Sequence, residues 1–190
     1  MFLLVPLLAL IGTDAIHGKV INSLIGPYIT YGERFYTCEP VNPTLPWKWY
    51  IRHSHFNPRK PKELQRLTGN VTGSTYSYDD SCWGKAVVDV RSNNQWKENA
   101  FVFDFKNNPC RAFRENMPGI FNFLYKQGGV EGTCKFKPEI YLLNDTPMDW
   151  TFPNIPVLPY GHYRVRVSAG KAEIVFCCLA ADVRVIPKLE

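Results

Sequence analysis

The chain has 190 residues, of which 45% are apolar and 21% are charged, and its formal net charge is +5. This length suits one domain, and the composition excludes a disordered chain because enough apolar surface is present to form a core. The charge is of the size that surface solvation usually produces, so it does not by itself indicate a nucleic-acid partner.

The first element in chain order is an apolar run over Met1–Ile11, which is too short to span a bilayer as a helix. It fits the core of a signal peptide, with small residues near Thr13 and Ala15 at the cleavage site. We therefore expect a signal peptide over 1–15, a single domain over 16–190 and a secreted, extracellular protein. Cleavage would remove Asp14 and raise the net charge from +5 to +6. The alternative interpretation of the run is a buried N-terminal strand.

Short apolar segments separated by turn residues follow. Tyr28–Tyr31 and Phe35–Tyr36 indicate strands in a region that is otherwise hard to interpret. Lys85–Arg91 has a strand pattern bounded by glycine and serine. The strand over Ala100–Phe105 is clearer, because its three phenylalanines alternate with other residues and must share one face.

Downstream, Pro118–Lys126 carries apolar residues at helical spacing between an initial proline and a terminal glycine pair, which predicts a short helix. Glu139–Leu143 predicts a strand that ends in a turn at Asn144. Tyr163–Val167 alternates as a half-buried strand, and after a predicted hairpin turn at Gly170 and Lys171 the strand Ala172–Ile186 returns. The expected fold class is all-β, an antiparallel β-sandwich or cup with one short helix.

Six cysteines are present, and an even number in a secretory context predicts disulfides, with fifteen possible connectivities. No Cys-x-x-Cys pair is present, which argues against a zinc ribbon or a thioredoxin-like redox site. Cys110 ends a strand and Cys134 follows the helix, so we predict a bond between them. We expect Cys38 and Cys82 each to bond to one of the two neighbours Cys177 and Cys178. Adjacent residues on a strand face opposite sides, so the two neighbours can have different partners.

Two acceptor sequences for N-glycosylation occur, Asn70-Val71-Thr72 and Asn144-Asp145-Thr146. Asn70 lies in a stretch rich in threonine, glycine and serine, and Asn144 is expected in a turn. Both should be exposed, and both should be glycosylated if the chain is secreted.

From Cys110 onward the order of motifs becomes more specific. The motifs occur in a fixed order along the chain. They are Phe103-Asp-Phe-Lys-Asn-Asn-Pro-Cys110, the short helix, Cys134-Lys-Phe-Lys137, Phe152-Pro-Asn-Ile-Pro-Val-Leu-Pro159, Gly161-His-Tyr-Arg-Val165 and, in the last strand, Leu179-Ala-Ala-Asp-Val183. This ordered set resembles the GM2 ganglioside activator and its arthropod relatives. The stretch Trp96–Val102 is similar to the insect chemosensory B proteins, secreted relatives tied to contact-pheromone sensing. The activator has eight cysteines, against six here.

The resemblance implies an apolar cavity between two sheets that accepts lipid tails, rim loops that touch a membrane surface or a receptor, and no catalysis. Together with the shared phenylalanine face and the apolar helix stripe, it predicts a cavity wall of Phe101, Phe103, Phe105, Ile120, Leu124, Phe152 and Tyr163. Val157, Leu158 and Tyr160 are expected at the rim, since apolar side chains in an exposed connection need something to contact. The alternative is a filled core, which suits any β-sandwich.

Other chemistries have weaker signals. The pair His53 and His55 lacks the further ligands that zinc needs, so no metal site is expected. The chain has neither a Gly-x-Ser-x-Gly elbow nor a His-Glu-x-x-His motif, and we expect no enzyme and no cofactor. The basic stretch over 52–66 belongs to no nucleic-acid-binding module. Two function classes remain, a secreted carrier of an apolar small molecule or lipid, such as a pheromone hydrocarbon, and a secreted interaction module that modulates a receptor or channel.

Overall fold

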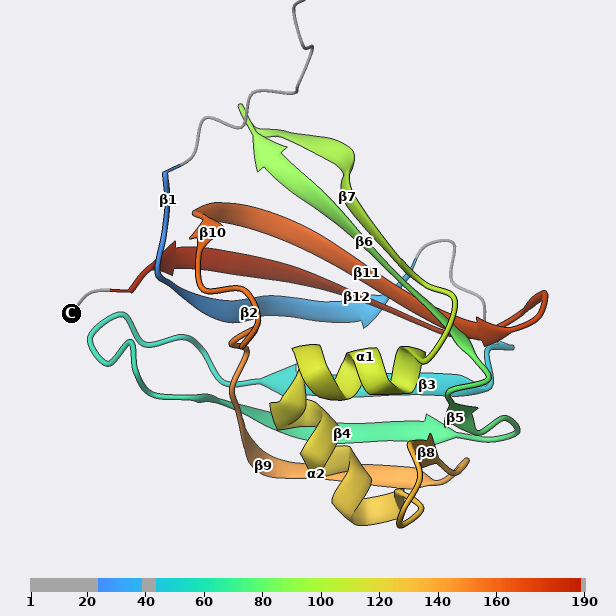
Figure 1. Cartoon of the computed structure of the whole chain (residues 1–190). Coiled ribbons are helices and arrows are strands. Elements are labelled where there is room, and N and C mark those ends of the chain that lie inside the picture. Colours follow the sequence, from blue (N-terminus) through green and yellow to red (C-terminus); the bar gives the residue numbers. More distant parts are fainter. Residues whose placement is uncertain (1–23, 39–43, 189–190) are drawn as a thin grey trace, which may run out of the picture.

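The computed structural model describes residues 24–38 and 44–188 (Figure 1). The predicted signal peptide lies outside these residues. Twelve strands and two helices are found in the described part of the chain. The strands are β1 (Ile25–Gly26), β2 (Tyr28–Thr37), β3 (Trp47–His53), β4 (Gln65–Gly73), β5 (Tyr78–Asp79), β6 (Trp83–Ser92), β7 (Gln95–Phe105), β8 (Lys135–Phe136), β9 (Ile140–Met148), β10 (Leu158–Pro159), β11 (Gly161–Lys171) and β12 (Ile174–Pro187). The helices are α1 (Pro109–Asn116) and α2 (Pro118–Gly128).

Two antiparallel sheets form the layers of the fold, which confirms the all-β prediction. The larger sheet has the order β2-β12-β11-β6-β7, and the smaller has the order β3-β4-β9. Two short pairs, β1 with β10 and β5 with β8, complete the structure. In Figure 1 the two sheets lie one above the other, and the β6–β7 hairpin reaches away from the three-stranded sheet.

The main core fills the space between the two sheets and the helices. Ile120, Phe121 and Leu124 of α2 belong to one buried cluster with Tyr141 and other inward-facing residues of the three-stranded sheet. The larger sheet adds Ala169 and Phe176 to the same cluster. Burial of large apolar side chains, worth roughly 1.5–3 kcal/mol each, therefore holds the helices and both sheets together.

Local predictions were correct for the strongest patterns and wrong at several boundaries. The helix at Pro118 is α2, but a second helix, α1, begins at Pro109 where none was predicted. The strand β9 does not end at Asn144. It continues to Met148 through a bulge in which Asp145 adopts a positive φ of 48°. The hairpin turn lies at Ala172 and Glu173, two residues beyond the predicted position.

The disulfide predictions are confirmed for four cysteines and wrong for two. Cys110 is bonded to Cys134, and Cys38 is bonded to Cys178. Cys82 and Cys177 were expected to be bonded as well, but both are free thiols in this structure. Cys177 faces the core, on the opposite side of β12 from the bonded Cys178, and burial raises its pKa to about 12. Burial also raises the pKa of the Cys82 thiol, so neither group is readily ionised.

Candidate ligand-binding face

The register of the five-stranded sheet places the three predicted phenylalanines on the inner face. Phe105 lies opposite Gly84, which is paired with Ala169, and Ala169 is paired with Cys177. Ala169 and Cys177 contact the main core, so this face is the one directed at the three-stranded sheet. Because residues two apart on a strand share a face, Phe101 and Phe103 lie on it too.

Beyond the main core, this inner face is apolar but open to solvent. Phe103 is 47% exposed, Phe101 is 39% exposed, and Val167 of the central strand β11 is 39% exposed. Four further residues of the same rows, Ala86, Val88, Val165 and Leu179, are only half-buried. We call these seven residues the apolar floor. It is a direct continuation of the face that forms the core, without the covering layer that the core has.

A second buried cluster closes one end of the floor. Tyr28, Val90, Tyr163 and Val185 form its centre, and Phe152, Leu158 and Tyr160 pack against it. Val88 belongs both to this cluster and to the floor. Two tyrosine hydroxyls are held by carbonyl oxygens of the segment after β9 and of β10, since Tyr28 donates to Ile155 at 2.9 Å and Tyr163 donates to Pro159 at 2.6 Å. We call this group the aromatic cluster.

The residues predicted to line one cavity are therefore divided among three places. Phe101 and Phe103 lie on the floor, with half-buried Phe105 at its end near the core. Phe152, Leu158, Tyr160 and Tyr163 form part of the aromatic cluster, and Val157 is exposed beside it. Ile120 and Leu124 are buried in the main core, where they touch other side chains. Their helical spacing matched a core helix as well as a cavity wall, so sequence could not separate the two.

A separate groove of about 370 Å³ lies where the two sheets meet, between β2, the β3–β4 connection and the residues after β9. Gln65 forms one end of it and joins the sheets, because its side-chain amide accepts from Gly32 N at 2.7 Å and donates to Gly32 O at 2.9 Å. A smaller groove of about 150 Å³ adjoins it and shares Tyr28, Thr151 and Lys188.

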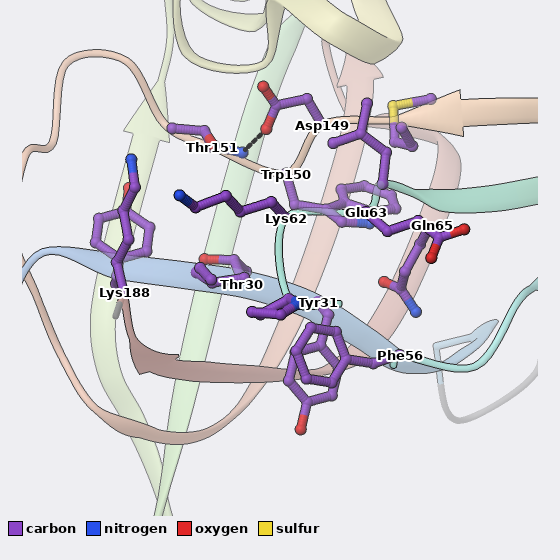
Figure 2. A pocket seen from close by; sticks show the side chains of 15 residues that line it. Thr30, Tyr31, Phe56, Lys62, Glu63, Gln65, Asp149, Trp150, Thr151 and Lys188 are labelled. Atoms are coloured by element: carbon purple, nitrogen blue, oxygen red, sulfur yellow. Dashed lines mark hydrogen bonds between the residues drawn. The ribbon is translucent and has the colours of Figure 1, made fainter. Parts of the chain in front are cut away.

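The lining of the larger groove is mixed in character (Figure 2). The rings of Tyr31 and Phe56 stack with centroids 4.0 Å apart, and Lys62 and Lys188 extend along the opening. Within the described residues, the buried Nε1 of Trp150 has no hydrogen-bond partner. Aromatic rings, two lysines and an unpartnered indole N–H thus share one groove, and the sequence motifs gave no indication of it, since its lining comes from four distant segments.

The outer face of the larger sheet carries charged networks beside apolar residues such as Val102. Asp89 is buried, accepts from Arg166 Nη2 at 2.8 Å and accepts from the backbone N–H of Asn99 at 2.9 Å. His162 Nε2 lies 2.9 Å from Glu33. Burial, followed by the nearby Arg184 guanidinium, lowers the pKa of His162 despite the Glu33 carboxylate. These groups stabilise the sheet from the side opposite the floor.

The two histidines considered for zinc do not share a strand face, because β3 ends at His53. Both ring nitrogens of His53 already lie within hydrogen-bond distance of backbone carbonyls, 2.9 Å from Glu33 O and 3.0 Å from Ser54 O. In the described part of the chain, Asp80 approaches the sulfurs of Cys110 and Cys134, but those sulfurs are joined in a disulfide. A disulfide sulfur is not the thiolate that a metal site requires.

Neither helix in the described part of the chain has the length and apolar character needed to cross a membrane. The two disulfides are compatible with an oxidising, extracellular environment. Comparison with protein-family models and with curated proteins found no match.

Proposed function

We propose that this chain is a secreted, non-catalytic binding protein for an apolar small molecule or lipid, and that the ligand lies on the apolar floor. The observation that carries the proposal is the exposure of Phe101, Phe103 and Val167 on a face that elsewhere forms the core. A contiguous apolar surface of this kind marks a site that a ligand or partner covers when the protein functions.

The surroundings of the floor favour a hydrocarbon chain over a flat protein partner. The floor ends at the aromatic cluster, whose rings offer an apolar end wall with hydroxyls already satisfied. Its other end meets the main core near α1, where Pro109 lies against Gly84. A surface bounded at both ends suits a ligand of limited length, and the resemblance to secreted lipid-binding cups agrees with this interpretation.

Binding would be driven by burial of apolar area, at about 25 cal/mol per Å², with few polar contacts. Each methylene that is buried contributes roughly 0.8 kcal/mol, so affinity should rise with chain length until the floor is full and then level off. The headgroup should matter less than the length. A pheromone hydrocarbon and a lipid acyl chain would both meet these requirements.

The test is to purify the protein from a secretory host, extract it with organic solvent and analyse the extract by mass spectrometry. A carrier brings apolar ligand with it, and the delipidated protein then binds a fluorescent fatty acyl probe. The absence of both a co-purified ligand and probe binding would overturn the proposal.

The filled main core supports a second candidate. Because Ile120, Leu124 and their neighbours leave that region packed, the chain also fits a secreted interaction module that modulates a receptor or channel. In that case the floor would bind a protein surface, and the delipidated protein would bind no acyl probe of any length.

A further inference from the structure

The outer face of the three-stranded sheet, which is directed away from the core, carries an unexpected patch of apolar residues, Tyr50, Leu142 and Ile140. The register places Tyr50, Asn70 and Leu142 side by side across β3, β4 and β9. The next row is Lys48, Thr72 and Ile140. Tyr50 is 73% exposed, Leu142 is 62% exposed and Ile140 is 64% exposed, so this face leaves large side chains in water.

Both N-glycosylation acceptor sequences lie on this same face. Asn70 was expected in an irregular polar stretch, but it lies in the central strand β4, between Tyr50 and Leu142. Asn144 is exposed two residues beyond Leu142 on β9. Asn70 therefore lies within the apolar patch and Asn144 beside it, although 74 positions separate them in the sequence.

Asn70 was expected to be exposed, but it is half-buried, and its side chain contacts that of Thr72. Thr72 Oγ1 donates to Asn70 Oδ1 at 3.2 Å, a bond that uses the amide oxygen and not Nδ2, the atom to which a glycan attaches. At the second acceptor, Thr146 is buried and Asp145 is bound by Arg66 at 2.8 Å. Modification of Asn144 must therefore precede the folding of β9.

We propose that N-linked glycans on Asn70 and Asn144 cover the apolar patch formed by Tyr50, Leu142 and Ile140. The proposal rests on the secretion that is part of the proposed function. In the reaction, Asn Nδ2 bonds to C1 of the first N-acetylglucosamine of a lipid-linked oligosaccharide. The bond from C1 to the donor pyrophosphate breaks, the amide loses one proton, and the lipid pyrophosphate leaves.

A glycan suits this face for two physical reasons. The C–H faces of sugar rings pack on aromatic and aliphatic side chains, and their hydroxyls restore contact with water. In addition, a contiguous patch of large apolar side chains left in water invites association with another protein surface. A glycan on the central strand, with a second on β9, would block that association sterically. The functional face would then be the inner face of the five-stranded sheet, which holds the floor.

The experiment uses the full chain secreted from insect cells, with a matched pair of variants at one position. Thr72→Ser keeps the acceptor sequence, whereas Thr72→Ala destroys it while leaving Asn70 in place. We expect glycosidase treatment to reduce the mass of the wild-type chain at two sites, of the serine variant at two and of the alanine variant at one.

The covering role is tested separately, by enzymatic removal of the glycans from folded protein. Removal should increase the fluorescence of an apolar dye and the tendency to aggregate, and the double substitution Tyr50→Thr and Leu142→Thr should abolish both increases. An unmodified Asn70, or unchanged dye binding after removal, would overturn the proposal. Acyl-probe binding by refolded, unglycosylated protein is independent of these results, so failure here is distinguishable from failure of the proposed function.

Discussion

Two adjacent positions on β7 provide a direct test of the apolar floor. Phe103 and Val102 have almost the same exposure, 47% and 46%, but alternate residues of a strand face opposite sides of the sheet. Phe103 lies on the floor, and Val102 lies on the outer face. Phe103→Asp should therefore weaken binding of an apolar ligand, whereas Val102→Asp introduces the same charge on the same edge strand without touching the ligand.

The size of the effect follows from the area that a ligand can cover. A phenylalanine side chain presents about 200 Å², and with 47% exposed about 95 Å² remains for a ligand to bury. At about 25 cal/mol per Å² this is about 2.4 kcal/mol, or a roughly fiftyfold weaker Kd when the ring is lost. The buried carboxylate adds to this loss, because its desolvation is not compensated by a partner.

The measurement is a fluorescence titration of delipidated protein with a fatty acyl probe, performed for the wild type and both variants. Thermal unfolding of each variant is recorded as a control for folding. Equal Kd values for the two variants would refute the assignment of the ligand to the inner face. A larger loss in Val102→Asp than in Phe103→Asp would place the ligand on the outer face instead.

Three further predictions concern stability and the thiols. Asp89→Ala removes the buried acceptor of Arg166 and should lower the free energy of unfolding by about 1–3 kcal/mol in urea titrations, whereas an unchanged midpoint would mean that this ion pair contributes nothing. Burial lowers the pKa of His162 in the folded state, so the unfolded chain binds more protons as pH falls through the ordinary histidine range. The free energy of unfolding, measured in urea titrations at several pH values, should therefore decline over this range, and it should decline less in His162→Gln. Unreduced protein should incorporate two equivalents of iodoacetamide when unfolded and none when native, because Cys82 and Cys177 have raised thiol pKa values; incorporation of none in both states would mean that all six cysteines are bonded.

Some of these features follow from local sequence alone. Alternation over Ala100–Phe105 placed the three phenylalanines on one face, because a strand repeats every two residues regardless of its neighbours. A proline at the start of α2 and glycines at its end defined this helix for similar local reasons. The Cys110–Cys134 bond could be predicted because the two cysteines lie on either side of the segment that contains α2.

Other features depend on which strands pair, and pairing is not local. The shared face of Asn70, Tyr50 and Leu142 exists only because β3 and β9 both flank β4. The larger groove forms from segments that meet only after the two sheets pack. Likewise, the apolar patterns of Phe103 and of Leu124 looked equally suited to a cavity wall. Packing of α2 against the three-stranded sheet buried Leu124 and left Phe103 uncovered, since the hydrophobic effect rewards burial without specifying the partner.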